Sequence, residues 1–138
     1  MADQSYADDP TIADDAALWR RIHPEWAVPD ENRGGLRVSS AAFANSRDGS
    51  PTSILIAETV ASSGRGPEDV LQAFDRYGLA SLRAGQARGC GQRVARDPLP
   101  DEAAHGLIVG DKTRWAKRCL AAAAVWVISP PRSPSADT

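Results

Sequence analysis

The stretch TSILIAETV, residues 52–60, decides the predicted fold, because it is the strongest strand signal in the chain. Its β-branched and aliphatic residues form a nearly continuous apolar run, which is typical of a strand buried on both faces. The preceding NSRDGSP, residues 45–51, combines Asp-Gly with Ser-Pro and predicts a turn. The following ASSGRG, residues 61–66, predicts a flexible loop. We therefore expect a central strand between two loops.

Other strands are expected on both sides of this stretch. LRVSSAAF, residues 36–43, reads as a short strand that runs into a turn, and residues 79–83 and 105–109 predict two more. ALWRRI, residues 17–22, is compatible with a strand or with one helical face, and Pro24 stops either element. These short strands predict a small sheet.

Two main helices are predicted after the central strand. Residues 67–78 begin with Pro67 and two acids, a pattern typical of a helix N-terminus, and residues 113–127 form the second helix, capped by Asp111 or Thr113. Between them, residues 84–89 predict a brief helix or a turn, because the glycines of this region weaken a helix prediction. The apolar stripes expected on the two helices are Val70, Leu71, Phe74 and Tyr77 on the first, and Trp115, Cys119, Ala122 and Trp126 on the second.

The order of the predicted elements favours an α+β fold. Strands and helices mix without the regular spacing of a doubly wound sheet, so we expect a small single domain with a short mixed or antiparallel sheet packed by two main helices. The domain is expected over residues 15–128. An acidic, disordered N-terminal segment is expected over residues 1–14, and a disordered tail rich in proline and serine over residues 129–138.

Composition narrows the class of protein. The chain has 138 residues, which suits one domain. No apolar run is long enough to span a bilayer, and the acidic N-terminus does not resemble a secretory signal. Basic residues are scattered and aromatic residues are few, so a nucleic-acid surface is not indicated. The two cysteines, Cys90 and Cys119, predict reduced thiols in a soluble, cytoplasmic protein.

Charge is distributed unevenly along the chain. Residues 1–31 hold eight acids and two bases, whereas the remainder holds 14 bases and 10 acids. An acidic head on a mildly basic body suggests a solvated extension, intramolecular steering or a segment that faces a partner.

Several sequence patterns are compatible with catalysis or metal binding, but each is incomplete. His23-Pro24-Glu25 matches half of a zinc deaminase signature, and the cysteine pair of the other half is absent. Zinc ligands normally come in close pairs, which the histidines and cysteines do not form, so no metal site is expected. Cys90 with His105 as its base is an alternative nucleophile. The helix start near Asp111 can either bind an anion or be capped by a side chain.

A second group of polar residues follows the predicted strands. Arg20 or Arg21 lies in the first element, and Arg37, Ser39 and Ser40 belong to the second. Ser53 opens the central strand, and Glu58 lies near its end. A carboxylate in a buried strand is costly without a partner, which makes Glu58 a candidate site residue.

The order of arginine, serine and glutamate along successive strands resembles that of ADP-ribosyltransferase-fold enzymes, including RES-type toxins. The stretch LWRRI…GGLRVSSAAF…GSPTSILIAE carries this resemblance. It implies an NAD-consuming site in which Arg20 or Arg21 anchors phosphates, Ser39 or Ser40 supports the nicotinamide side, and Glu58 stabilises an oxocarbenium-like ribose.

The chain is also similar to small bacterial proteins of unassigned function that share the runs LWRRIHP, SSAAF, DGSPTS and ARDPLPDEAAH. The resemblance implies a bacterial, cytoplasmic, single-domain protein. Within these runs, His23 and His105 each lie at the end of an element, so they are candidates for a paired acid and base.

Three functions follow from these patterns. The first is a binding or accessory module that acts through protein contacts, because tryptophans are well suited to anchor interfaces. The second is a small enzyme that handles NAD or a nucleotide through Arg20, Arg21, Ser39, Ser40 and Glu58. The third is a hydrolase or transferase that uses His23 and His105. No cofactor is expected for the first function, and NAD is the cofactor of the second.

Overall fold

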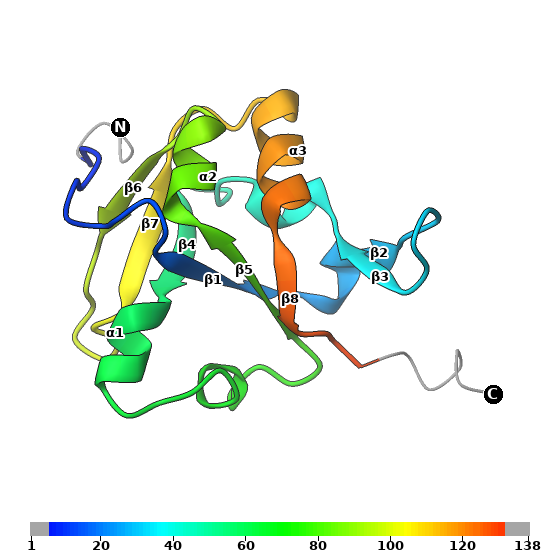
Figure 1. Ribbon diagram of the computed structural model, residues 1–138, viewed down its shortest axis with the longest axis horizontal. Coiled ribbons are helices and arrows are strands. Elements are labelled where there is room, and N and C mark those ends of the chain that lie inside the picture. The colour runs from blue at the N-terminus through cyan, green and yellow to red at the C-terminus, as the bar shows by residue number, and fades with distance from the viewer. Residues whose placement is uncertain (1–5, 132–138) are drawn as a thin grey trace.

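The protein is an α+β domain, as the order of predicted elements indicates. The structure, a computed structural model, describes residues 6–131. Within them, a six-stranded antiparallel sheet is joined by a small two-stranded sheet and three α-helices (Figure 1). The strands are β1 (Ala17–Ile22), β2 (Ala27–Pro29), β3 (Leu36–Val38), β4 (Thr52–Ile56), β5 (Gly78–Arg83), β6 (Arg93–Arg96), β7 (His105–Val109) and β8 (Val125–Ile128). The helices are α1 (Ala57–Ser62), α2 (Ala84–Gly89) and α3 (Arg114–Ala123), with 3₁₀ turns at Pro24–Trp26, Ser40–Phe43 and Asp69–Leu71.

The predicted central strand lies in the middle of the large sheet. The strand order is β6-β7-β4-β1-β5-β8, so β4 has a neighbour on each side. Ile54 and Ile56 face the larger hydrophobic core, and Leu55 faces a smaller core that contains Val60 of α1. The alternation of these buried side chains explains why a continuous apolar run forms a strand here. The strand ends at Ile56, and α1 occupies the rest of the predicted stretch.

The helices lie on both faces of the sheet. Figure 1 shows α2 and α3 together on one side and α1 on the other, next to the long connection that leads to β5. Phe43 and Leu120 are fully buried in the larger core, between the sheet and the helices on that side. The helices on the two faces of the sheet cover β1 and β4, the strands that build the site described below.

The predicted helix over residues 67–78 is wrong. The segment consists of turns around the 3₁₀ helix Asp69–Leu71, with i to i−3 backbone hydrogen bonds such as Phe74 N–H to the Leu71 carbonyl. Arg76 has a left-handed backbone with φ of 66°, which ends any helical course. The apolar residues contact separate partners: Val70 is buried in the small core, and Phe74 packs against the guanidinium of Arg21. Tertiary contacts therefore override the local helix signal.

The predicted helix over residues 113–127 is correct only in its first part. Thr113 caps α3 by accepting a hydrogen bond from the Ala116 amide, as one of the two capping alternatives predicts. The helix ends at Ala123, and the β-branched run after it forms β8, which pairs with β5. Trp126 therefore leaves the expected helical stripe, and Trp115, with 63% of its surface exposed, points away from the core.

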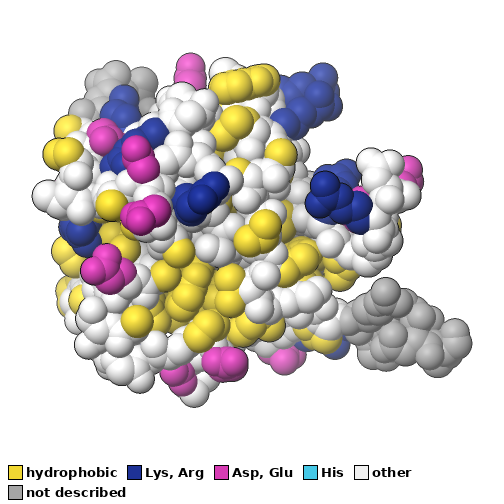
Figure 2. Space-filling model, viewed as in Figure 1, with side chains coloured by type: hydrophobic (Ala, Val, Ile, Leu, Met, Phe, Trp, Pro, Cys, Tyr) yellow, Lys and Arg dark blue, Asp and Glu magenta, His cyan; other side chains and the backbone are white. Residues whose placement is uncertain are grey.

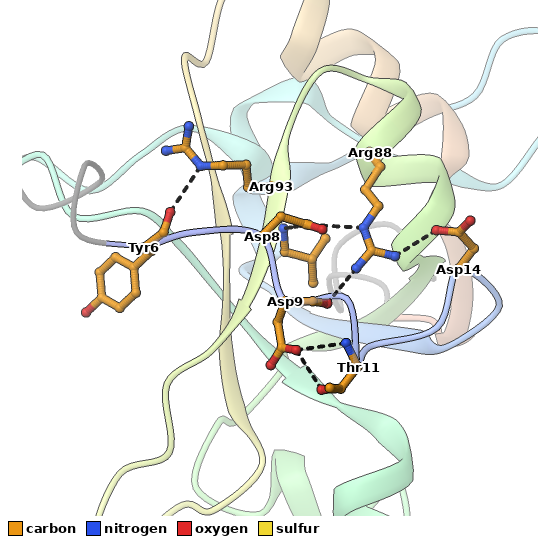
Figure 3. A network of polar contacts seen from close by, with 8 residues as sticks. Tyr6, Asp8, Asp9, Thr11, Asp14, Arg88 and Arg93 are labelled. Atoms are coloured by element: carbon orange, nitrogen blue, oxygen red, sulfur yellow. Dashed lines mark hydrogen bonds and ion pairs between the residues drawn. The ribbon is translucent and has the colours of Figure 1, made fainter.

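The acidic N-terminal segment is ordered over residues 6–14, which corrects the predicted disorder of residues 1–14 for this part. Arg88 of α2 binds Asp8 at 3.0 Å, Asp14 at 2.7 Å and the Asp9 carbonyl at 2.9 Å (Figure 3). Ile12 is 2% exposed and belongs to the larger core. The acids of the segment thus bind intramolecular partners, a possibility that the charge asymmetry left open. Residues 1–5 lie outside the described part.

The C-terminal tail is packed at its start. Pro130 is buried, and a Cβ at position 78 would lie only 2.6 Å from the Pro130 Cδ. The predicted disorder of residues 129–138 therefore fails for Pro130, while residues 132–138 lie outside the described part. Gly78 is required at this place because the chain crosses so closely.

Removing the Arg88 side chain is expected to release the N-terminal segment. Arg88→Gln loses charge-assisted hydrogen bonds to two carboxylates and a carbonyl, and the exposure of Asp14 limits their strength. We expect a loss of about 1–2 kcal/mol in the free energy of unfolding by urea. Amide exchange of Asp9, which is bonded to the Val94 carbonyl, should accelerate. Arg47→Gln, in an exposed turn, is the control, and an unchanged Asp9 exchange rate in Arg88→Gln would contradict the contact.

The two cysteines form a disulfide, which contradicts the expected reduced thiols. Cys90 lies at the C-terminal end of α2 and Cys119 lies in α3, with 5.7 Å between their Cα atoms. The residues are 29 apart in sequence, and they meet because both helices pack on the same face of the sheet. Spacing alone does not reveal this proximity. Among the helices of residues 6–131, none combines the length and apolar character that crossing a bilayer requires.

Candidate ligand pocket

The candidate site is a pocket at a split between the two central strands. β1 and β4 pair at Leu18 with Ile56 and at Trp19 with Leu55, and no further pair follows. Beyond Trp19 the strands diverge, and β1 continues with β5 alone. The cavity at this split has a volume of about 230 Å³. Its walls consist of Trp19, Arg20, Arg21, Trp26, Ser53, Ile54, Leu55, Phe74, Tyr77 and His105.

Arg20 fills the space that the missing strand pairs leave. Its Nε donates to the Ala42 carbonyl at 2.9 Å, and its Nη1 donates to the Ser53 carbonyl at 2.8 Å. The Ser53 carbonyl lies beyond the last pair of β1 with β4, and the Ala42 carbonyl belongs to the 3₁₀ turn Ser40–Phe43, so Arg20 gives each of them a donor. The guanidinium also lies over the ring of Trp26, 5.2 Å from its centroid. Burial lowers the pKa of Arg20 to about 10, so the guanidinium stays charged at neutral pH although its charge is poorly hydrated.

Arg21 is held on the other side of β1. Its Nε donates to the Val70 carbonyl at 2.7 Å, and its guanidinium lies 4.1 Å from the centre of the Phe74 ring. Burial lowers the pKa of Arg21, and the nearby Glu102 carboxylate opposes this effect. Glu102 itself forms a bidentate ion pair with Arg65, which also lowers the pKa of that carboxyl. The charge of Glu102 is thus largely committed to Arg65.

The two pocket arginines use few of their N–H donors and have no carboxylate partner among the described residues. Arginine offers five N–H donors. Arg20 uses two hydrogen bonds and Arg21 one, all to backbone carbonyls. Among the described residues, no carboxylate lies within ion-pair distance of either guanidinium. Half-buried charges without an acidic partner favour the binding of an anion from outside.

A serine, a histidine and an aspartate are linked at the same pocket. His105 Nε2 lies 3.2 Å from the Ser53 hydroxyl. On the other side of the ring, Nδ1 lies 2.9 Å from the Asp97 carbonyl oxygen and 3.2 Å from the Asp97 carboxylate. Both oxygens accept hydrogen bonds, so Nδ1 carries the proton and Nε2 accepts from the serine. This arrangement can remove a proton from the Ser53 hydroxyl.

Strand pairing positions these three residues. Leu55 of β4 pairs with His105 of β7, and Ser53 is two residues before Leu55 on the same strand face. Asp97 follows β6, and its amide donates to the His105 carbonyl at 3.0 Å. The sequence analysis placed Ser53 among the polar residues of the sheet but gave it no role, and it did not consider Asp97 as a site residue. An exposed serine within a strand of buried residues was the available signal for Ser53.

His23 and His105 do not form an acid–base pair within the pocket. His23 Nδ1 accepts a hydrogen bond from the Glu25 amide at 3.0 Å and caps the 3₁₀ turn Pro24–Trp26. Its ring contacts Tyr77, with centroids 5.3 Å apart, and Trp26, at 5.7 Å. His23 therefore supports the aromatic wall from behind, while His105 lines the cavity.

The residues that the ADP-ribosyltransferase resemblance implies are divided between the pocket and other places. Arg20 and Arg21 line the cavity, whereas Ser39, Ser40 and Glu58 do not. The Ser39 hydroxyl accepts from the Ala41 amide and caps a 3₁₀ turn that begins at Ser40. Glu58 is exposed on α1, which corrects its expected position in a buried strand. Its solvation removes the reason for treating it as an unusual carboxylate.

Other chemistry predicted from single motifs is not supported. Cys90 has no free thiol for catalysis, because its sulfur is bonded to Cys119. Among residues 6–131, no group of three or more histidine, cysteine or acidic side chains is arranged to hold a metal ion.

In comparisons with known proteins, no family model, curated protein or solved structure matches this chain. Fold and site therefore define its class by themselves. It is a small α+β domain with a pocket lined by arginine and aromatic residues at the split between two sheet strands.

Proposed function

We propose that the protein binds a small organic anion in the pocket between β1 and β4. The observation that carries the proposal is that Arg20 and Arg21 are half-buried, unpaired with any described carboxylate, and still have unused N–H donors. A carboxylate or phosphate group would accept those bonds and offset the cost of the buried charge.

The aromatic walls of the pocket favour an anion that carries a flat, apolar group. Trp19, Trp26, Phe74 and Tyr77 offer ring surfaces beside the two guanidinium groups. The cavity of about 230 Å³ is below the roughly 300–1,000 Å³ of sites for drug-sized ligands. A substituted benzoate or a phenyl phosphate suits this size, whereas only a fragment of a dinucleotide fits inside. The NAD-consuming alternative thus has less support, and incubation with NAD followed by measurement of released nicotinamide tests it directly.

Protein contacts remain a proposal of their own. Figure 2 shows apolar side chains gathered on one face between α1 and β8, with acidic side chains near its lower edge. On β8, which is an edge strand, Val125 is 63% exposed and Val127 39% exposed. An apolar edge strand favours association, so this surface supports the predicted binding or accessory module.

The cellular setting also remains a proposal. The sequence predicts a bacterial, cytoplasmic protein. The bridge between Cys90 and Cys119 favours an oxidising compartment instead, because glutathione and thioredoxin keep cytosolic thiols reduced. The redox state of these cysteines in protein isolated from its native cell distinguishes the two settings.

Titration with benzoate tests the proposed function. Isothermal calorimetry should detect a dissociation constant of about 1 mM or tighter, which corresponds to about −4 kcal/mol. Quenching of the pocket tryptophans, Trp19 and Trp26, should follow the same curve. Arg21→Gln should weaken binding about tenfold or more, because a charge-assisted hydrogen bond is lost. Arg47→Gln is the control. The proposal fails if benzoate and phenyl phosphate bind no better than neutral benzyl alcohol, or if Arg21→Gln leaves their affinity unchanged.

A further inference from the structure

The hydrogen-bonded chain of Ser53, His105 and Asp97 opens into the anion pocket. We propose that Ser53 is a nucleophile that accepts the acyl group of small anionic esters, with His105 as general base and Asp97 as the residue that orients the histidine. This inference rests on the proposed function, because Arg20 and Arg21 would hold the anionic group of the ester. It adds an acyl-transfer reaction to a binding site.

The orientation of the imidazole supports base catalysis. The backbone carbonyl oxygen of Asp97 accepts a hydrogen bond from Nδ1–H at 2.9 Å, and the Asp97 carboxylate lies 3.2 Å from Nδ1. The Nε2 lone pair therefore faces the Ser53 hydroxyl at 3.2 Å. The His105 side chain is 16% exposed, so the ring is held in place, whereas Ser53 is exposed to an incoming substrate. A fixed base beside an accessible hydroxyl is the arrangement that activates a serine.

The position of Ser53 in the sheet fixes its hydroxyl. Its chain neighbours on β4, Thr52 and Ile54, are buried, and Ser53 itself pairs with Leu107 of β7. On the opposite side, where β1 has diverged, Ser53 borders the cavity. A site built on a central strand is held more precisely than one on a loop.

Arg20 lines the same cavity as Ser53 and would supply positive charge to a substrate bound there. Its Nη1 donates to the carbonyl oxygen of Ser53 itself, at 2.8 Å. The guanidinium has further N–H donors, which can receive the negative charge that develops on the substrate oxygen. Charge stabilisation of this kind needs donors that are already in position, and Arg20 is fixed by two carbonyls and the Trp26 ring.

The proposed reaction has two steps. In the first, Ser53 Oγ bonds to the ester carbonyl carbon while its proton moves to His105 Nε2. The bond from that carbon to the leaving oxygen then breaks, and the leaving oxygen takes the proton from His105 as the alcohol departs. In the second step, water gives a proton to His105 and attacks the acyl-serine, and Ser53 leaves with that proton. The sum is ester plus water giving acid plus alcohol.

The mono-para-nitrophenyl ester of terephthalic acid is the probe, because its rigid ring presents a benzoate-like carboxylate that cannot reach the ester carbon of the same molecule. We expect release of para-nitrophenolate and an acyl adduct on the tryptic peptide of residues 48–65, detected by mass spectrometry. Ser53→Ala should reduce the rate at least 100-fold and remove the adduct, and His105→Gln should reduce the rate about 100-fold or more. Ser81→Ala, a serine of β5 outside the pocket lining, is the matched control.

Two further measurements test the roles of Asp97 and the arginines. Asp97→Asn keeps the backbone carbonyl that orients Nδ1 and removes only the carboxylate charge, which would stabilise the protonated imidazole. It should lower kcat at least tenfold with KM unchanged, whereas a purely structural role of the carboxylate would lower thermal stability and leave kcat unchanged. After subtraction of the rate without protein, the terephthalate ester should react at least tenfold faster than neutral para-nitrophenyl benzoate, and Arg21→Gln should abolish this preference.

The outcomes separate this inference from the proposed function. An unreactive ester, or an adduct that persists in Ser53→Ala, overturns the nucleophile. If benzoate still binds in that case and Arg21→Gln weakens it, the proposed function stands alone. If benzoate does not bind and the ester does not react, both fail.

Discussion

Opening the disulfide between Cys90 and Cys119 is expected to lower the free energy of unfolding by about 3–4 kcal/mol. The bridge closes a loop with a sequence separation of 29 residues and ties α2 to α3. In the chain-entropy description, a loop of this length restricts the unfolded chain by roughly that amount. The melting temperature should fall by on the order of 10–20 °C. Cys90 is buried next to the larger core, so the loss of the bridge also loosens the helix layer that supports the sheet.

Urea unfolding with and without a reductant measures this effect. The double variant Cys90→Ala, Cys119→Ala is the control, because it should unfold at one urea concentration whether or not the reductant is present. For the wild-type protein, the urea concentration at the midpoint of unfolding should be lower with the reductant than without it. Two free thiols in protein purified under oxidising conditions, or an unchanged midpoint after reduction, would contradict a structural bridge.

Local patterns predicted the elements whose signal is strong over the whole segment. Residues 52–56, 79–83 and 105–109 form the strands that their apolar runs predict. Residues 84–89, where the glycines left a helix or a turn open, form a short helix. The helix prediction failed in a segment whose conformation is set by tertiary contacts. Residues 67–78 begin like a helix, yet Phe74 packs on Arg21, and the chain follows that contact.

The sequence analysis named three of the residues that line the pocket as candidate site residues, but not their arrangement. Arg20, Arg21 and His105 were identified by chemical type, and all three line the pocket. Their convergence depends on the divergence of β1 from β4, which no local pattern encodes. The partner of His105 is Ser53, 52 residues away, and only the pairing of β4 with β7 brings them together.

The second large effect is expected at Arg20, where fold and site meet. Arg20→Leu removes both donors from the Ala42 and Ser53 carbonyls, and the Ser53 carbonyl lies beyond the last pair of β1 with β4. The hydrogen bond to Ala42 is partly buried and the bond to Ser53 is exposed, so water replaces part of what is lost. An unsatisfied buried acceptor costs about 1–3 kcal/mol, and removing a poorly hydrated charge offsets part of this cost. We expect a net loss of about 1–2 kcal/mol in the free energy of unfolding by urea, together with loss of benzoate binding.

Arg20→Lys separates the two roles of this residue. A lysine ammonium keeps the charge and can bond to the carbonyls, but it lacks the planar fork that lies over Trp26. Most of the stability should therefore return, while benzoate affinity returns only in part. Benzoate should also raise the melting temperature of the wild-type protein, because a ligand that binds the folded protein stabilises it. Its negative charge would compensate for the burial that lowers the Arg20 pKa to about 10. Full stability in Arg20→Leu would show that water satisfies both carbonyls, so that the split between β1 and β4 is held open by packing rather than by the arginine.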